Sequence, residues 1–410
     1  MQDLSKVVCP PYDVISPKDR EDFYQRHPHN IIRLILGKDL PGDTDFSNKY
    51  TRAAQFLKAW KEEEILIQEP QPAIYLYEQG FSLGTRRALR KSLLCLVKLE
   101  DLATGHIYTH EATLPKQKAD RLRLLRACRA NLSPVFALYP EEESSTEELL
   151  KSITSSPPEI DFQWNAGLRN RLWVIKDWMT IEKVSKLLEP KPLFIADGHH
   201  RYEVALAYRN ELENLSPQFP ANYTLMALVS MSDPGLYIMP IHRVIRVPPG
   251  PGPSVEELLE ESFDIEDLAE GSQYRHLAKR LEEGPEHTFG LFVGSPRGYY
   301  LLTLRDNKLL QRALSQDPQC LRELDVRILH GLAIDKILGK TSGEENHIKY
   351  VHDAQEAVHL VEEGDYDMAF FLNPTKMEEV SEVASSRLKM PPKSTFFYPK
   401  LLSGLVINPL

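Results

Sequence analysis

The chain has 410 residues, 42% of them hydrophobic and 26% charged, as in an ordinary globular protein with room for two or three domains. The 49 Lys and Arg residues against 59 Asp and Glu residues give a net charge of −10, which argues against non-specific binding to nucleic acid or an anionic membrane. The four cysteines form no CxxC pair and no apolar run reaches the roughly 20 residues of a membrane span, so we expect a cytoplasmic protein without a disulfide framework.

The N-terminal part predicts a mixture of helices and strands. "VVCPPYDVIS" indicates a short strand interrupted by prolines, and Ser16-Pro17 is typical of a helix start. Residues 72–102 alternate β-branched and aromatic residues around glycines, which predicts hairpin-like strands. A basic amphipathic helix is expected at about 119–130, and "NLSPVFALY" leads into a strand.

The middle of the chain alternates strand and helix, the pattern of an α/β fold. Strands are expected in "LRNRLWVIKD", "KPLFIAD", "YTLMALVSM" and "LYIMPIHRVIRV", and helices in "MTIEKVSKLLE" and "HRYEVALAYRNEL". Six of the seven residues 248–254 are Pro or Gly, which indicates a linker. We therefore expect two domains, 1–247 and 255–410, the second with a hairpin in "HTFGLFVGSPRGYYLLTLR".

The turn "IADGHHRYE" between a buried strand and a helix has the residues of an anion site. A helix N-terminus offers unpaired N–H groups and a partial positive charge. Gly198 lets a ligand approach the backbone, Arg201 can grip phosphate oxygens and Asp197 can hold Mg²⁺. His199 or His200 can donate to a phosphate oxygen. The alternative is structural: Asp197 caps the helix and the histidines lie on the surface. The HExxH and HxxEH spacings are absent, so a zinc protease is excluded.

A second polar cluster follows the expected strand in "HIYTHE". A carboxylate such as Glu111, on a loop beside a phosphate site, is equipped to deprotonate a hydroxyl nucleophile. The next helix carries four arginines over about half of its circumference, which favours a solvated face for most of them. They are Arg121, Arg123, Arg126 and Arg129.

A third cluster lies in "MPPKSTFFYPKLLSGL", residues 390–405. It combines aromatic residues with the polar donors Lys393, Ser394, Thr395 and Lys400. The segment can pack its aromatic side chains on the core or place its donors near a site. Both interpretations can hold together, because alternate side chains of an extended strand face opposite ways.

Two resemblances rest on these motifs. "CPPYDVIS", "THEATLPKQKADRLRLLRACRANLSPVFALY", "IADGHHRYEVAL", "DPGLYIMPIHR", "YDMAFFLNPT" and "KSTFFYPKLLSGL" resemble the bacterial and archaeal family designated domain of unknown function 1015, from near residue 7 to the end. The order of "HE" at 110–111, "LFIADGHHRYEVAL", "YDMAFFLNPTKMEEVSEVA" and "PPKST" is more distantly similar to archaeal free-serine kinases of the ParB/sulfiredoxin-like superfamily. Those enzymes phosphorylate L-serine and belong to a superfamily that binds nucleotide phosphates at a strand–loop–helix turn.

The second resemblance implies a fold and a set of site residues. The implied fold is α/β, with a ParB/sulfiredoxin-like core, an N-terminal α+β portion and a C-terminal α/β region packing back on the site. Glu111 is implied as the base, Asp197 as the Mg²⁺ ligand, and Arg201 with His200 as the groups that neutralise the phosphate. Nucleotide contacts are expected from Asp197, Gly198, His199, His200 and Arg201, and substrate contacts from His110, Asp13, Lys393, Ser394 and Thr395.

The expected activity is Mg²⁺-dependent phosphoryl transfer, in either direction, between ADP or ATP and a small hydroxyl compound, with L-serine or O-phosphoserine as the first candidate. The alternative is a nucleotide-binding or nucleotide-hydrolysing regulatory protein of the ParB-like superfamily. A sulfiredoxin-like reductase is disfavoured, because no cysteine lies within 60 residues of Asp197. We expect neither nucleic acid nor membrane as partner, and a homo-oligomer stays open.

Overall fold

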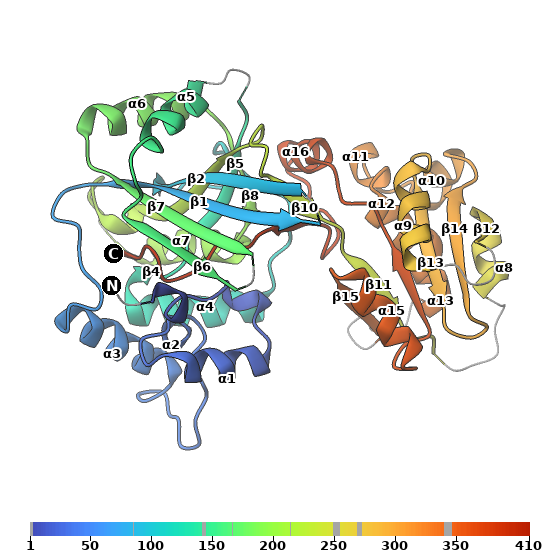
Figure 1. The fold of residues 1–410 in the computed structure, drawn as a ribbon, viewed down its shortest axis with the longest axis horizontal. Helices are drawn as coiled ribbons and strands as arrows, with labels where there is room; N and C mark the ends of the chain where they lie inside the picture. Colours follow the sequence, from blue (N-terminus) through green and yellow to red (C-terminus); the bar gives the residue numbers. More distant parts are fainter. Residues whose placement is uncertain are drawn as a thin grey trace. The chain divides into compact units, whose positions relative to one another are not determined.

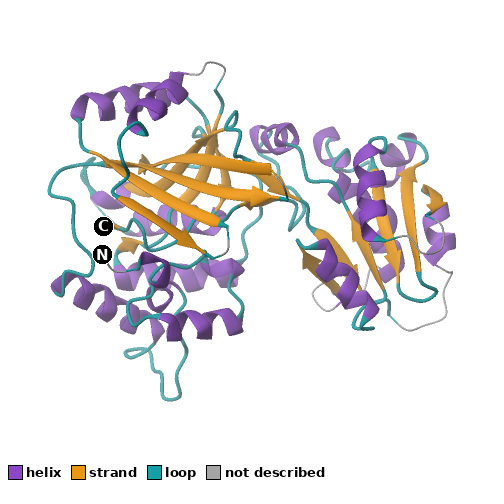
Figure 2. Cartoon of the chain, viewed as in Figure 1, coloured by secondary structure: helices purple, strands orange, loops and turns teal. Residues whose placement is uncertain are grey.

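The computed structural model describes residues 3–84, 86–141, 145–165, 167–213, 215–248, 255–268, 273–339 and 347–410. They form two compact units, each with its own sheet and helices (Figure 1, Figure 2). The first unit comprises Met1–Tyr237 and Pro399–Leu410, and the second comprises Ile238–Tyr398. The mixed α/β class is confirmed in both units.

This division differs from the sequence-based boundaries, 1–247 and 255–410. The chain leaves the first unit after Tyr237, ahead of the Pro-Gly segment, most of which lies outside the described residues. It returns at Pro399, so the last twelve residues belong to the first unit. The physical reason is a long-range strand pairing: β10 (Tyr237–Met239) pairs with β17 (Phe396–Tyr398), which brings the outgoing and returning segments together.

The first unit is built on an eight-stranded mixed sheet with the strand order β3-β8-β5-β9-β2-β1-β7-β6. The pairs β3–β8 and β5–β9 are parallel and the other neighbours are antiparallel. The predicted hairpin is present as β1 and β2. The strands are β1 Ile74–Leu83, β2 Arg86–Lys98, β3 Ile107–Thr109, β5 Val135–Tyr139, β6 Ile160–Trp164, β7 Leu168–Ile175, β8 Leu193–Asp197 and β9 Tyr223–Ser230, with a separate pair β4 Ala130–Asn131 and β18 Asn408–Pro409.

The helices of the first unit pack into two large hydrophobic cores and a smaller one between α4 and α7. Those on the sheet bury side chains such as Leu149 and Val184 against it, while the N-terminal helices pack around Trp60. α1 begins as predicted, because the Ser16 hydroxyl and the Asp19 carboxylate cap each other's backbone N–H groups. The helices are α1 Pro17–Arg26, α2 Ile32–Ile35, α3 Lys49–Glu62, α4 Pro115–Cys128, α5 Ser145–Ile153, α6 Trp178–Leu188 and α7 His199–Glu211.

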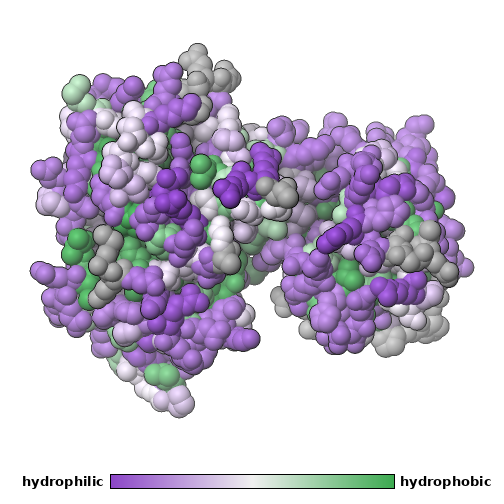
Figure 3. Space-filling view, viewed as in Figure 1, coloured by the Kyte–Doolittle hydropathy of each residue, from purple (hydrophilic) through white to green (hydrophobic). Residues whose placement is uncertain are grey.

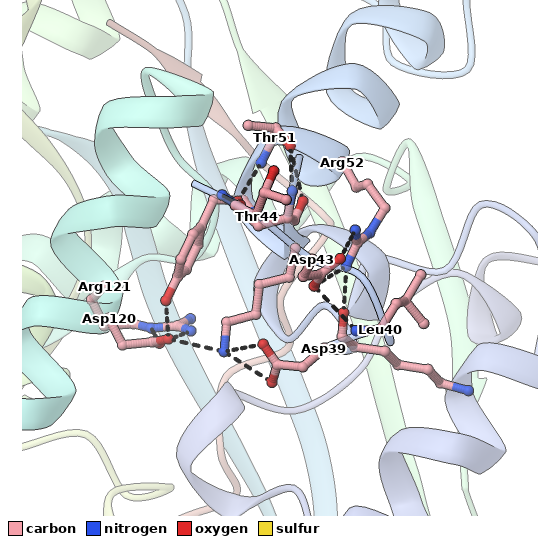
Figure 4. Close-up of polar contacts among 12 residues, drawn as sticks. Asp39, Leu40, Asp43, Thr44, Thr51, Arg52, Asp120 and Arg121 are labelled. Carbon is pink, nitrogen blue, oxygen red and sulfur yellow. Dashed lines mark hydrogen bonds and ion pairs between the residues drawn. The ribbon is translucent and has the colours of Figure 1, made fainter. Parts of the chain in front are cut away.

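A polar network ties the loop before α3 to α3 and α4 (Figure 4). The two terminal nitrogens of Arg52 donate to the two carboxylate oxygens of Asp43, at 2.5 and 2.8 Å. On α4, Asp120 accepts a hydrogen bond of 2.7 Å from the Tyr50 hydroxyl and lies 3.4 Å from Nζ of Lys49. These contacts hold α4 against α3, and the loop with the predicted base directly precedes α4.

The second unit contains a six-stranded antiparallel sheet with the order β12-β14-β13-β16-β11-β15. The predicted hairpin is β13–β14. The strands are β11 His242–Ile245, β12 Phe263–Asp267, β13 Thr288–Val293, β14 Gly298–Leu304, β15 Ile348–Val351 and β16 Met368–Phe371. The helices are α8 Val255–Glu260, α9 Tyr274–Glu283, α10 Lys308–Ala313, α11 Gln319–Arg322, α12 Asp325–Leu329, α13 Asp335–Leu338, α15 Ala354–Glu362 and α16 Met377–Ser385, with a π-helical turn at His330–Ile334.

The surface of each unit carries few large apolar side chains. On the face drawn in Figure 3, hydrophilic residues predominate and apolar ones are scattered. Trp178 and Met179 at the start of α6 are among the most exposed apolar residues, at 68% and 77%. Among the described residues, no helix has the length and apolarity needed to cross a bilayer.

Candidate active site

The predicted anion site is the junction of β8 and α7 in the first unit. β8 is buried along its whole length and ends at Asp197, and α7 begins at His199. Gly198 joins them with a φ of 88°, in the left-handed region. A Cβ here would lie 2.8 Å from the Arg201 guanidinium. Gly198, not Asp197, occupies the N-cap position, and no side-chain cap is found for α7 among the described residues.

Asp197 is buried and forms ion pairs with two cationic side chains, Arg201 and Lys400. Its Oδ2 accepts a hydrogen bond of 2.5 Å from Nη2 of Arg201, and its Oδ1 accepts one from Nζ of Lys400. Arg201 is held further by donating from Nη1 to the carbonyl of Pro134. Burial alone would raise the pKa of Asp197, but the charges of Lys400 and Arg201 outweigh burial and hold this pKa below its usual value. Asp197 is therefore ionised at neutral pH.

His199 links the turn to the predicted base. Its Nδ1 lies 3.3 Å from Oε2 of Glu111, and its ring meets the ring of His110 edge to face, with centroids 4.7 Å apart. Burial opposes ionisation of Glu111, but the hydrogen bond with His199 and the positive charges around it outweigh that effect. The pKa of Glu111 therefore lies well below its usual value. The structure thus places an ionised carboxylate beside the turn.

Two further predicted residues lie at the same turn. Nε2 of His200 accepts a hydrogen bond of 2.9 Å from the Leu114 backbone N–H, which leaves the proton of the neutral ring on Nδ1. Burial lowers the pKa of His200 and favours that neutral form. The side chain of Asp13 is exposed and lies within electrostatic range of Asp197, Arg201 and Lys400. Desolvation and the charge of Asp197 raise the pKa of Asp13, against the opposite effect of Arg201.

Two nitrogens of this turn are buried without a hydrogen-bond partner in the described part of the chain. They are Nε2 of His199, whose side chain is 2% exposed, and Nε of Arg201, whose side chain is 13% exposed. A buried polar atom without a partner costs about 1–3 kcal/mol. Because native structures seldom leave such atoms unpaired, these two nitrogens are donors or acceptors available to a ligand or water.

A small cavity of about 60 Å³ opens beside Arg201. At about 30 Å³ for each molecule of liquid water, this volume corresponds to about two water molecules. Its polar lining residues are Tyr12, Arg121, Asn131, Ser133, Arg201 and Thr224, and its apolar lining comes from α2, α4, α7 and the segment 130–132. Of residues 197–201, Arg201 alone lines this cavity, so the open space lies beside Arg201.

Of the four arginines expected on a solvated helix face, three are exposed and Arg121 is buried. Arg121 donates from Nη1 to the carbonyl of Ile35 at 2.6 Å, and its guanidinium lies 4.1 Å from the centroid of the Tyr12 ring. It is therefore part of the cavity wall. The prediction that most of these arginines are solvated is therefore confirmed, and Arg121 is the exception because its guanidinium contacts the carbonyl of Ile35 in α2.

The predicted donors of the C-terminal segment belong to the second unit. Ser394 and Thr395 are buried, and the carbonyl of Lys393 accepts a hydrogen bond of 3.0 Å from Nη2 of Arg243. Their contact with a substrate stays a prediction. Lys400 of the same sequence motif belongs to the first unit and reaches the turn.

A residue that the sequence does not single out is Arg90 on β2. It is 1% exposed, and its guanidinium lies 4.8 Å from the centroid of the Phe136 ring. Its Nη2 donates to the side-chain oxygen of Gln79 and to the carbonyl of Pro399. Arg90 therefore ties the segment just before Lys400 to the sheet. Alternation along β2 could not reveal it, because an arginine in a strand normally marks a solvent-facing position.

Residues 1–327 match the family described as "Protein of unknown function (DUF1015)". The chain belongs to this family. The resemblance to this family that the sequence motifs indicated is thereby confirmed over residues 1–327. No curated protein matches the chain.

Several solved structures match this DUF1015 protein at low identity. A conserved hypothetical protein from Pyrococcus furiosus is 13% identical, over 75% of this chain and 92% of that one, with a TM-score of 0.36. A mutant free serine kinase in complex with ADP is 13% identical, over 74% and 87%, with a TM-score of 0.37. SbnI with a C-terminal truncation, from Staphylococcus aureus, is 12% identical, over 76% and 85%, with a TM-score of 0.36. Likeness at this level carries no argument about function.

Proposed function

We propose that the chain transfers a phosphoryl group between ADP or ATP and a small hydroxyl compound, with L-serine and O-phosphoserine as the first candidates. One observation carries the proposal: the ionised Glu111 lies 3.3 Å from His199, at the uncapped start of α7. A helix N-terminus with two unpartnered buried nitrogens favours a phosphate, and an adjacent carboxylate can accept a proton.

In the proposed step, the hydroxyl oxygen of the substrate attacks the terminal phosphorus of the nucleotide. The new P–O bond forms as the bridging P–O bond breaks, and the leaving nucleotide keeps the electron pair of that bond. Glu111 accepts the hydroxyl proton. In the reverse direction, Glu111 returns this proton to the oxygen of the departing hydroxyl compound. The low pKa of Glu111 keeps the carboxylate ionised at neutral pH, which is the form that accepts a proton, but it also makes the carboxylate a weak base.

Charge on the transferred group is met by residues already in place. Arg201 is fixed by Asp197 and by the carbonyl of Pro134, so its unpartnered Nε is preorganised for a phosphate oxygen. The Nδ1 proton of neutral His200 provides a further donor. Positioned donors of this kind stabilise developing negative charge without reorganising during the reaction.

Asp13 and Asp197 are the carboxylates that would hold a Mg²⁺ ion arriving with the nucleotide. Asp13 reaches solvent beside Asp197, whereas both oxygens of Asp197 already accept hydrogen bonds from cations. No group of three or more His, Cys, Asp or Glu arranged to hold a metal occurs in the part of the chain that the structure describes. Asp13, and Asp197 once a cation leaves it, would hold Mg²⁺ together with phosphate oxygens and water. Bound there, Mg²⁺ would offset phosphate charge.

The test is an assay of both directions with purified full-length protein. We would incubate it with Mg²⁺ and ATP or ADP plus a panel of hydroxy amino acids, and separately with O-phosphoserine plus AMP or ADP. Nucleotides are followed by ion-exchange chromatography and phosphorylated products by ³¹P NMR. The proposal predicts phosphorylated product in equal amount to the nucleotide consumed.

Two other outcomes would reject the proposed transfer. Nucleotide hydrolysis that no hydroxyl compound accelerates would favour the regulatory protein of the ParB-like superfamily. Nucleotide binding without turnover would favour a non-catalytic nucleotide-binding protein.

A further inference from the structure

The C-terminal segment Pro399–Leu410 returns to the first unit and delivers one cation to the turn. Nζ of Lys400 donates to Oδ1 of Asp197, and only 14% of the Lys400 side chain is exposed. The electrostatic effect of Lys400 also lowers the pKa of Glu111 and opposes the rise in the pKa of Asp13. Lys400 thus acts on the three carboxylates of the site.

The backbone of Lys400 is anchored independently of its ammonium group. Its carbonyl accepts a hydrogen bond of 3.1 Å from Nε2 of Gln79, and the preceding carbonyl accepts one from Arg90. Three residues later, Ser403 pairs with Cys9 across an isolated bridge. The ion pair with Asp197 is therefore not needed to hold the segment in place.

The two cations on Asp197 differ in how easily they can leave it. Arg201 is confined by the carbonyl of Pro134 and by close packing on Gly198. The side chain of Lys400 is a flexible four-carbon chain that ends in a compact ammonium group with three N–H donors. Its Nζ can move between acceptors by side-chain rotation while its backbone stays anchored.

We propose that Lys400 is a phosphate-binding residue whose Nζ rests on Oδ1 of Asp197 in the free protein and passes to a phosphate oxygen when the nucleotide binds. The exchange leaves Oδ1 of Asp197 open to a metal ion or water. The inference rests on the proposed function, because it takes the ligand to be a nucleotide. No covalent bond forms or breaks. Buried ion pairs add little net stability, so a role in ligand binding accounts better than stability for a second cation here.

The test compares Lys400→Met and Lys400→Arg with the control Lys58→Met. Lys58 is an exposed lysine of the same unit, 3.8 Å from Glu62. Affinity for ADP, and for inorganic pyrophosphate as a probe without a nucleoside, is measured by calorimetry without any acceptor. Because a hydrogen bond between charged groups contributes about 1.5–3 kcal/mol, Lys400→Met should weaken binding of both ligands by roughly 10- to 100-fold. Lys400→Arg should recover much of the loss, and Lys58→Met should bind like the unmodified chain.

An ADP affinity unchanged by Lys400→Met, even with a lower melting temperature, would overturn the inference and leave the proposed function standing. If the unmodified chain bound neither ADP nor pyrophosphate, the proposed function would fail as well. Should Lys400→Met not fold, Lys400→Arg provides the second measurement. In NMR spectra of protein with ¹³C-methylated lysines, the signal that is missing from Lys400→Arg belongs to Lys400. That signal should shift when ADP is added to the unmodified chain. Absence of that shift would also overturn the inference.

Discussion

At the scale of single residues, the proposed transfer depends most on Glu111, whose carboxylate contacts His199 at the start of α7. Glu111→Gln keeps the size of the side chain and removes its ability to accept a proton. We expect nucleotide affinity to change little, and turnover in the phosphoryl-transfer assay to fall by about 100-fold or more.

A suitable control is Glu182→Gln, since Glu182 lies on α6 in an exposed pair with Lys186. It should leave turnover unchanged. Near-normal turnover in Glu111→Gln would show that another group accepts the proton.

The lowered pKa of Glu111 also predicts a dependence of stability on pH. A carboxylate whose pKa falls on folding stabilises the folded state above its unfolded pKa, which is about 4.5. That contribution is lost as the pH drops below this value towards the folded pKa. The groups that act on Glu111 are His199, His110, Lys400 and Asp197.

Urea unfolding, followed by tryptophan fluorescence at pH 7 and pH 3.5, measures this contribution. The unmodified chain should be more stable than Glu111→Gln at pH 7, and the difference should shrink at pH 3.5. An equal difference at both values would mean that Glu111 has an ordinary pKa in the folded state.

At the scale of elements, the junction of β8 and α7 combines a left-handed residue with close packing. Gly198→Ala should lose roughly 1–2 kcal/mol of stability from the backbone conformation. The new methyl group also meets the Arg201 guanidinium, so Arg201 must shift and nucleotide affinity should fall. Gly42→Ala is a matched control, because Gly42 has the same φ of 88° with no atom within 4 Å of the added Cβ.

Thermal unfolding and calorimetry separate the two effects of these substitutions. Both variants should lose stability from the backbone conformation, Gly198→Ala should lose more because Arg201 must also shift, and only Gly198→Ala should lose affinity for ADP. Equal ADP binding by the two variants would show that the position of Arg201 does not matter.

At the scale of the whole molecule, the last twelve residues belong to the first unit although they follow the second in sequence. A chain ending at Tyr398 lacks Lys400, the bridge of Ser403 to Cys9 and the pairing of β18 with β4. We expect the first unit to melt at a lower temperature, while the second keeps its own transition. All four tryptophans, Trp60, Trp164, Trp173 and Trp178, lie in the first unit, so their fluorescence follows that unit alone.

Circular dichroism, which follows both units, provides the comparison. The truncation should lower the fluorescence midpoint and leave a separate transition at the original temperature in circular dichroism. A single shared transition at the lower temperature would show that the two units unfold together.

Short-range features of the sequence were sufficient for much of the local structure. The helix start at Ser16-Pro17, the hairpin of β1 and β2, and the order β8, turn, α7 follow from capping, alternation and glycine conformation, which act over a few residues. The helix expected at about 119–130 begins earlier, at Pro115, because proline fits the first turn of a helix.

Sequence alone thus determined the α/β class, the family and the composition of the turn at 197–201. Only the tertiary structure decided that Asp197 shares its carboxylate between Arg201 and Lys400, which lies 203 residues away. It also decided that Arg90 is buried and that the chain end returns to the first unit. The reason is physical: propensities and caps act between neighbours along the chain, whereas ion pairs and strand pairing between distant segments depend on how the whole sheet assembles.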